Sequence, residues 1–140
     1  MRTDTFSVEA DATLTTDEVN AAYAWVEWPQ REPWRLDAIS ASCTWFAARA
    51  IGGELLGVVR LLDDGGLHAS IWDLIVHPAH QRRGIGSALA QSALARCEDR
   101  RLVAVVSTPA AVEFFHALGF ANGSHGHTAM YRRPPSGDHH

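Results

Sequence analysis

The ten residues Gln81–Ala90, QRRGIGSALA, hold the most informative pattern in this chain. Two arginines run directly into Gly84-Ile85-Gly86, and small and apolar residues typical of a helix follow. The pattern fails the dinucleotide-binding fingerprint, because Leu89 takes the place of the third small residue, and it lacks the Gly-Lys-Ser/Thr of a P-loop. A strand, a short basic loop and a helix start fit it better, since the free amides and the dipole of the helix start attract phosphate. Close packing of the helix would also account for a lone Gly-x-Gly.

Turn residues and apolar runs on either side of this stretch predict alternating strands and helices. The Thr-Thr-Asp-Glu sequence at 15–18 is typical of a capped helix start, and Pro33 suits the first position of a second helix. Glycine-containing turns at 52–53 and 63–66 predict two hairpins. The expected strands cover 5–8, 43–51, 55–62, 67–76 and 102–106, the expected helices cover 15–26, 33–41, 84–98 and 110–118, and 120 with 127–131 is expected to close the sheet.

The order of these elements predicts an α/β chain of the α+β type with one mixed sheet. Antiparallel hairpins come first and a strand–helix–strand crossover follows, and such crossovers are right-handed as a rule. Helices should cover both faces of the sheet. A length of 140 residues predicts a single domain over 1–133, and the sequence PPSGDHH at 134–140 predicts a disordered tail.

Composition and charge narrow the classes of partner. A net charge of −4 argues against a nucleic-acid partner, and no apolar run is long enough to predict a membrane partner. The first ten residues lack the apolar segment of a signal peptide, so a cytoplasmic location is expected. Cys43 and Cys97 lie among apolar neighbours and are expected to be buried thiols.

Eight histidines raise the question of a metal site. His77 and His80 fall in a loop, and His125 and His127 lie near the end of the chain. No cysteine–histidine set has the spacing of a zinc site, so no metal is expected.

Two motifs in order resemble those of one protein family. The run Leu74–Leu89, LIVHPAHQRRGIGSAL, has a strand ending in Val-x-Pro and then the form Q/R-x-x-G-x-G/A. It resembles the cofactor-binding motif of the GNAT N-acetyltransferase superfamily. Ala111–Phe120, AVEFFHALGF, resembles the later motif A-x-x-F-Y-x-x-L-G-F of the same family. The resemblance implies a GNAT-like central mixed β-sheet in which the parallel strands 67–76 and 102–106 splay apart.

The resemblance also implies acetyl-CoA as the cofactor. Backbone donors of Arg82–Ala88 would meet the pyrophosphate, and the backbone of Val76 would pair with the pantetheine arm. The N–H of Leu74, with Ile75 sharing the duty if the strand bulges there, would meet the charge that develops on the thioester oxygen. The full set of implied cofactor-binding residues is Leu74, Ile75, Val76, Gln81, Arg82, Arg83, Gly84, Ile85, Gly86, Ser87, Ala88, Thr108 and Phe115.

The chemistry that the resemblance implies is direct attack of a neutral amine on the thioester, which requires a proton acceptor. Asp73 is the leading candidate, because it is a single carboxylate in an apolar strand. A structural pair with an arginine, or a cap on a neighbouring loop, would also explain Asp73. Phe115 stands where many members have a tyrosine that protonates the leaving thiolate, and Thr108 stands where asparagine is common. Thr108 is expected to hydrogen-bond the pantetheine or to cap the next helix.

The acceptor pocket is expected at the end of the first helix and in the loop after it. An aromatic wall with one carboxylate would suit an amine with an apolar or aryl body. The candidate substrate-binding residues are Tyr23, Trp25, Glu27, Trp28 and Tyr131, although the aromatic residues would equally staple the helix to the sheet.

These features together predict an acetyl-CoA-dependent N-acetyltransferase that acts on the primary amine of a small molecule, similar to arylalkylamine acetyltransferases. Two alternatives stay open: a non-catalytic acyl-CoA-binding sensor or partner module, and a protein N-acetyltransferase. An exposed last strand would allow a homodimer.

Overall fold

The computed structural model describes residues 6–135, and the chain divides into two compact units, one ending at Ala104 and the other starting at Val105. The strands are β1 (Phe6–Glu9), β2 (Thr44–Ala50), β3 (Leu55–Asp63), β4 (His68–Val76) and β5 (Leu102–Val105). The α-helices are α1 (Thr16–Trp25), α2 (Pro33–Ser42), α3 (Ile85–Arg96) and α4 (Val112–Ala117), with short 3₁₀ turns η1 (Pro78–His80) and η2 (Pro109–Ala111). None of the helices in this part of the chain has the length and apolar character needed to cross a bilayer.

Local sequence signals account for the helix starts. The Thr15 hydroxyl accepts a hydrogen bond from the Glu18 amide at 3.0 Å, and the Glu18 carboxylate accepts one from the Thr15 amide at 3.0 Å. This capping box satisfies two amides that a helix start leaves without partners. Pro33 is the first residue of α2, where its missing N–H costs nothing. The predicted boundaries of both helices are therefore confirmed to within a residue or two.

The five strands lie in the sheet in chain order, β1-β2-β3-β4-β5. The first four pair antiparallel, with Phe6 opposite Ala50 and with Trp45 opposite Arg60. β5 begins beside the start of β4, where the Leu102 amide donates to the Leu67 carbonyl at 3.2 Å.

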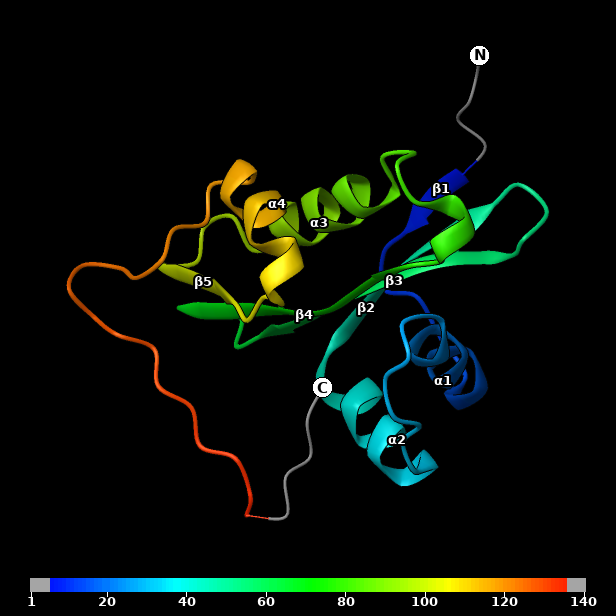
Figure 1. Cartoon of the computed structure of the whole chain (residues 1–140), viewed down its shortest axis with the longest axis horizontal. Helices are drawn as coiled ribbons and strands as arrows, with labels where there is room; N and C mark the ends of the chain where they lie inside the picture. Colours follow the sequence, from blue (N-terminus) through cyan, green and yellow to red (C-terminus); the bar gives the residue numbers. More distant parts are fainter. Residues whose placement is uncertain (1–5, 136–140) are drawn as a thin grey trace. The chain divides into compact units, whose positions relative to one another are not determined.

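Helices cover both faces of the sheet in the first unit, as predicted (Figure 1). On one face, α1 and α2 pack through Val19, Ala22, Tyr23 and Leu36 onto a row of sheet residues that comprises Trp45, Ala47, Val58 and Ile75. On the other face, α3 lies so close to Gly57 that an added Cβ would be 3.1 Å from the Leu89 side chain and 3.3 Å from the Ile85 side chain. The same Cβ would be 2.9 Å from the Ile75 carbonyl oxygen, so only glycine fits there.

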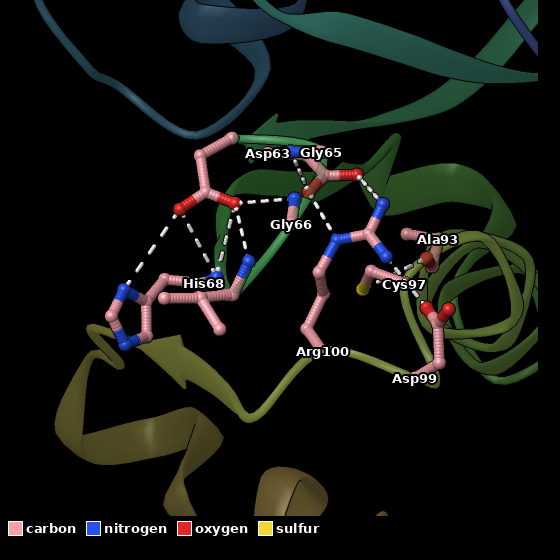
Figure 2. Close-up of polar contacts among 10 residues, drawn as sticks. Asp63, Gly65, Gly66, His68, Ala93, Cys97, Asp99 and Arg100 are labelled. Carbon is pink, nitrogen blue, oxygen red and sulfur yellow. Dashed lines mark hydrogen bonds and ion pairs between the residues drawn. The ribbon is translucent and has the colours of Figure 1, made fainter.

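Two carboxylates at the turn between β3 and β4 hold it by hydrogen bonds and an ion pair, as Figure 2 shows. Asp63 forms a two-point ion pair with Arg100, with distances of 2.7 and 3.0 Å. Asp64 accepts hydrogen bonds from the amides that follow it, those of Gly66 at 2.8 Å, Leu67 at 2.9 Å and His68 at 3.1 Å. Because Arg100 precedes β5, this pair ties the segment before β5 to the turn before β4.

The second unit contains α4 and a long non-helical segment. Phe115 is buried and packs edge-on against Phe114 and Phe120, with ring centroids 5.1 and 5.7 Å apart. Gly119 follows the helix with φ +98°, a backbone angle that favours glycine.

The strand expected at 127–131 is absent, and so is a strand at Phe120. The segment holds only an isolated bridge between Ser124 and His127, with positive φ at Gly123 before it and at His125 and Gly126 within it. These turns fold the chain back on itself over four residues, and the residues after them extend without a partner strand. This prediction was wrong, so these residues do not form the exposed last strand that would have allowed a homodimer. The predicted disorder at 134–140 falls mostly on residues outside those the structure describes.

Candidate active site

The centre of the candidate site is a bulge in β4. The pairing of β3 with β4 runs from Val58 opposite Ile75 to Arg60 opposite Trp72, so two β4 residues, 73 and 74, lie against one residue of β3. Asp73 takes a φ of +52°, which is rare for a residue other than glycine. A bulge of this kind interrupts the ladder and leaves backbone groups without their usual cross-strand partner.

The bulge places the Asp73 carboxylate among buried polar groups from three elements. Oδ2 of Asp73 accepts a hydrogen bond from the Tyr23 hydroxyl of α1 at 2.8 Å and one from Nε of Arg60 of β3 at 2.9 Å. The Asp73 side chain is 2% exposed and that of Arg60 is 14% exposed. We refer to Tyr23, Arg60 and Asp73 as the bulge cluster.

Electrostatics keep both donors of the bulge cluster protonated. Burial alone would lower the pKa of Arg60, but the charge of Asp73 and the hydrogen bond to it raise that pKa overall. Burial, followed by the charge of Asp73 and the hydrogen bond to it, raises the pKa of Tyr23 above its ordinary value. At neutral pH the Tyr23 hydroxyl is therefore a hydrogen-bond donor and not a source of protons.

Arg60 is held from several sides. Its guanidinium carbon lies 6.0 Å from the centre of the Trp45 ring and 5.8 Å from the centre of the Trp72 ring. The sheet register sets this arrangement, because Trp45, Arg60 and Trp72 are directly opposite one another on three neighbouring strands. Nη1 of Arg60 also donates to the Cys43 sulfur at 3.5 Å. The surrounding rings favour the cation electrostatically.

The contacts of Asp73 match the structural alternative foreseen for it, a pair with an arginine. The Tyr23 and Arg60 donors both meet Oδ2, so an amine proton arriving there would compete with them. The role of Asp73 as proton acceptor stays a prediction, and the geometry favours the paired role. Sequence reasoning missed Arg60, whose signal is a charged residue in an otherwise apolar strand, LLGVVRLL.

The basic loop and the start of α3 follow β4 directly. Nε2 of Gln81 donates to the Val76 carbonyl at 3.3 Å, which folds the loop back onto the strand end. Arg82 has φ +66°, and Gly84, the N-cap of α3, has φ +81°. The first helical bond of α3 runs from the Ala88 amide to the Gly84 carbonyl at 3.0 Å.

The amides that α3 leaves without acceptors inside the helix are those of Ile85, Gly86 and Ser87. The exposed side chains of Arg82 and Arg83 lie in the loop that precedes these amides. Because the Ala88 amide is already bonded within the helix, it is the weakest of the donors expected for the pyrophosphate. The donor set fits a diphosphate, since amides at a helix start and guanidinium groups are both typical anion ligands.

A chain of aromatic contacts, which sequence reasoning did not foresee, joins the end of α1 to this loop. The Trp25 ring lies 4.8 Å from the His77 ring, which lies 5.3 Å from the His80 ring. Nδ1 of His80 is 2.6 Å from Nη1 of Arg83, and Nδ1 of His77 accepts from the Ala79 amide at 3.0 Å. Both histidines thus have local structural partners in the loop.

The expected acceptor residues divide between packing and exposure. The rings of Tyr23 and Trp28 lie 5.7 Å apart, and both residues belong to or pack on the core under α1. Glu27 is exposed, with φ +61° in the turn that ends the helix. Tyr131 lies in the second unit and is 69% exposed. Tyr23, Trp25 and Trp28 thus pack on the core as the packing alternative expects, and their contact with an acceptor amine stays a prediction.

Two expected cofactor residues lie in the second unit. The Thr108 side chain makes no capping hydrogen bond at the start of η2, so the capping role foreseen for it is wrong. Its carbonyl instead accepts from the Ala111 amide at 3.0 Å. Phe115 has the core contacts described above, and its contact with a cofactor stays a prediction.

Comparison with known proteins now assigns the fold to a family. The model of the acetyltransferase (GNAT) family matches residues 12–120, and the chain belongs to that family. A GNAT family acetyltransferase from Streptococcus pneumoniae has a similar structure, with a TM-score of 0.79 and 26% identity over 93% of this chain and 98% of that one. The resemblance and the mixed-sheet fold expected from the sequence are thereby confirmed.

Curated relatives share part of the sequence. The chain is 28% identical to the chloroplastic serotonin N-acetyltransferase 2 of Oryza sativa subsp. japonica over 123 residues. The aligned region covers 83% of this chain and 62% of that protein. It is 32% identical to the uncharacterized N-acetyltransferase ycf52 of Gracilaria tenuistipitata var. liui over 82 residues, and this aligned region covers 57% of this chain and 45% of that protein. The chain thus spans less than two thirds of the length of these relatives.

Proposed function

We propose that this chain is an acetyl-CoA-dependent N-acetyltransferase that acts on the primary amine of a small molecule. The observation that carries the proposal is one continuous segment, 73–88, in which a strand bulge is followed by a basic loop and a glycine-started helix. Family membership supplies the expectation of an acyl-CoA donor.

Acetyl-CoA, when bound, supplies the acetyl group as an activated thioester. The amides of Ile85, Gly86 and Ser87, together with Arg82 and Arg83, would hold its diphosphate, since this donor set suits an anion. The strand end at Val76 would orient the pantetheine arm by backbone hydrogen bonds, in the manner of an added strand.

The residues at the bulge would handle the charge that develops during transfer. The Leu74 amide, with that of Ile75 next to it, is proposed to donate to the oxygen that becomes negative. The donor is part of a strand, so it needs no reorganisation at the moment of reaction. Phe115 has no proton to give, and the proposed site does not use α4 as an acid.

An amine with an aromatic or apolar body is the substrate class that we favour. Trp25 is half-buried at the end of α1, and its ring lies against His77 at the start of the loop that follows β4; Trp28 is half-buried in the turn after the helix. The relative in Oryza sativa is named for serotonin, an arylalkylamine, and its similarity extends over 83% of this chain. Both observations support an aryl-alkyl amine over a polar one.

The test is release of the coenzyme thiol from acetyl-CoA across a panel of primary amines. We expect aryl-alkyl amines to give the highest kcat/KM, and Arg82→Ala to raise the KM for acetyl-CoA. Arg101→Ala is the matched control, because Arg101 is an exposed arginine outside the loop. Tight coenzyme binding without release by any amine would favour a non-catalytic binding module, for which the absence of an acid at Phe115 is the supporting feature.

Preference for a peptide amine over all small amines in that panel would instead favour protein acetylation. The histone acetyltransferase TAP1 of Glycine max, 30% identical over 58% of this chain and 36% of that protein, makes this the other outcome worth measuring. No binding of acetyl-CoA at all would overturn the proposal.

A further inference from the structure

The bulge cluster joins three elements at a single oxygen atom, Oδ2 of Asp73. We infer that Arg60 and Tyr23 are positioning residues for acetyl transfer, which hold Asp73 and with it the backbone that presents the Leu74 amide. The inference rests on the proposed function, because it assigns these residues to the same site.

The backbone at Asp73 requires outside support. A φ of +52° at a residue other than glycine is unfavourable inside a strand and persists only where surrounding contacts hold it. The Asp73 carboxylate reaches two other elements, because it accepts hydrogen bonds from Arg60 of β3 and from Tyr23 of α1. Without these two anchors, β4 would be free to move toward regular pairing, in which the Leu74 amide would face a different direction.

Arg60 is itself unusually well fixed for a long side chain. The Trp45 and Trp72 rings flank its guanidinium, and the Cys43 sulfur accepts from Nη1. A lysine would lack the planar group that fits between two rings and donates from Nε and Nη1 at once. The cluster therefore asks for arginine specifically, which gives a sharp test with the conservative variant.

The competing account gives the same carboxylate a chemical role. If Asp73 accepted the amine proton, replacing Asp73 would change the pH dependence of kcat. Replacing Arg60 would then affect kcat mainly by its effect on the Asp73 carboxylate. If the bulge cluster acts by position, all three side chains act as one unit and their losses do not add.

The experiment compares Arg60→Met, Arg60→Lys, Asp73→Asn and Tyr23→Phe, together with the double variant Arg60→Met/Asp73→Asn. Asparagine is chosen at 73 because it tolerates positive φ. We expect kcat to fall on the order of a hundredfold in Arg60→Met, because a small misplacement of reacting groups costs about that much in rate. In the same variant, the KM for acetyl-CoA should stay near that of the wild type and the pH profile of kcat should keep its shape. The kcat of Arg60→Lys should stay low as well. The double variant should lose no more of its kcat than either single variant.

The Asp63–Arg100 pair supplies the matched control (Figure 2). Arg100 is 13% exposed and pairs with Asp63 and Asp99, so Arg100→Met removes an ion-paired arginine as buried as Arg60, away from the bulge. We expect Arg100→Met to lower stability and to keep kcat. Equal kcat in the Arg60→Met and Arg100→Met variants would overturn the inference, and so would a loss in Asp73→Asn with an altered pH profile while Arg60→Met retains turnover.

A second measurement does not depend on turnover. In the ¹⁵N-labelled full chain, we expect the Leu74 amide resonance to shift when acetyl-CoA is added to the wild type, and to lose this response in Arg60→Met and Tyr23→Phe. An unchanged Leu74 response in both variants would overturn the inference. A wild type that turns over no amine would remove the proposed function, and the amide response would still decide the role of the cluster. Tyr23→Phe serves if Arg60→Met fails to fold, because it keeps the ion pair.

Discussion

Three residues between the bulge of β4 and the start of α3 have left-handed backbone angles. Asp73, Arg82 and Gly84 have φ values of +52°, +66° and +81° within twelve positions. Such conformations cost free energy for Asp73 and Arg82, which carry side chains, and we expect the shape of this segment to serve the proposed binding of acetyl-CoA.

Gly84 provides the first test of this idea. Space is open around an added Cβ, so Gly84→Ala should act through backbone strain alone and cost about 1–2 kcal/mol of unfolding free energy. We also expect weaker acetyl-CoA binding in titration calorimetry, because the amides after Gly84 would turn. Gly65→Ala is the control, since Gly65 has φ +80° and equally open surroundings outside the site. Equal coenzyme affinity in both variants would contradict the role given to the helix start.

Tyr23 predicts how stability changes at alkaline pH. Its folded-state pKa lies above the unfolded value of about 10, so the folded chain keeps a proton that the unfolded chain releases. The stabilisation is complete below about pH 10 and is lost as pH rises above that value. Urea unfolding between pH 8 and 11 should show a steeper alkaline fall for the wild type than for Tyr23→Phe.

At neutral pH, Tyr23→Phe should lower the unfolding free energy by about 1.5–3 kcal/mol, because it removes a buried hydrogen bond to a charged group. An alkaline slope that is identical in the two proteins would mean that Tyr23 ionises in the folded state as it does in the unfolded one.

At the scale of elements, β3 and α3 approach each other closely at Gly57. Gly57 has no room for a side chain, since an added Cβ would meet the Ile75 carbonyl at 2.9 Å. The Ile75 carbonyl belongs to the backbone of β4 and cannot yield as a flexible side chain does, and the Ile85 and Leu89 side chains of α3 would be displaced as well.

Gly57→Ala should therefore cost about 1–3 kcal/mol of unfolding free energy, as overpacking of a core does. Coenzyme affinity should fall with it, because Ile85 and Leu89 of α3 face Gly57 and the same helix begins the phosphate site. Thermal unfolding and calorimetric titration measure the two effects. Gly52→Ala, in an open turn, is the control and should leave both quantities unchanged; a Gly57→Ala protein that behaves like it would contradict the packing argument.

Regular elements were predictable from sequence, whereas the features that distort them were not. Caps, prolines and turn glycines mark α1, α2 and the two hairpins locally. The bulge at Asp73 has no such mark, because a period-two interpretation of IWDLIV gives an acceptable strand without it. Only the register against β3, set by Arg60 and Val58, reveals the extra residue.

The bulge cluster was equally hidden, because Tyr23 lies 50 positions from Asp73 and no local pattern joins them. The failed strand at 127–131 has the opposite cause. Its composition allows a strand, but a strand forms only where a neighbouring strand can hydrogen-bond with it. The sequence alone does not show whether such a neighbour is present.

For the molecule as a whole, the candidate chemistry is concentrated in the first unit. Segment 73–88 and the bulge cluster lie before Ala104, while Thr108 and Phe115 lie after it. The family match crosses this division, since it covers 12–120. Arg82 and Arg83 supply local positive charge at this segment, while the net charge of −4 of the whole chain argues against a polyanion such as nucleic acid as the partner.

Acetyl-CoA binding should therefore stabilise the folded chain. At a free concentration 100 times its dissociation constant, the unfolding free energy should rise by about 2.7 kcal/mol. Chemical denaturation with and without acetyl-CoA measures this rise, and sodium acetate at the same concentration should have no effect. If the coenzyme left the midpoint of unfolding unchanged, the chain would not bind it in the folded state.

The chain-order arrangement of the sheet also bears on how the protein folds. Each of the neighbours β2, β3 and β4 is joined to the next by a short turn, so these strands can zip together without closing a long loop. β1 is separated from β2 by two helices and β5 is separated from β4 by α3, so both strands join the sheet only after longer loops close. We expect the three-strand meander to form the folding nucleus, which would place the bulge of β4 among the earliest parts of the molecule to become ordered.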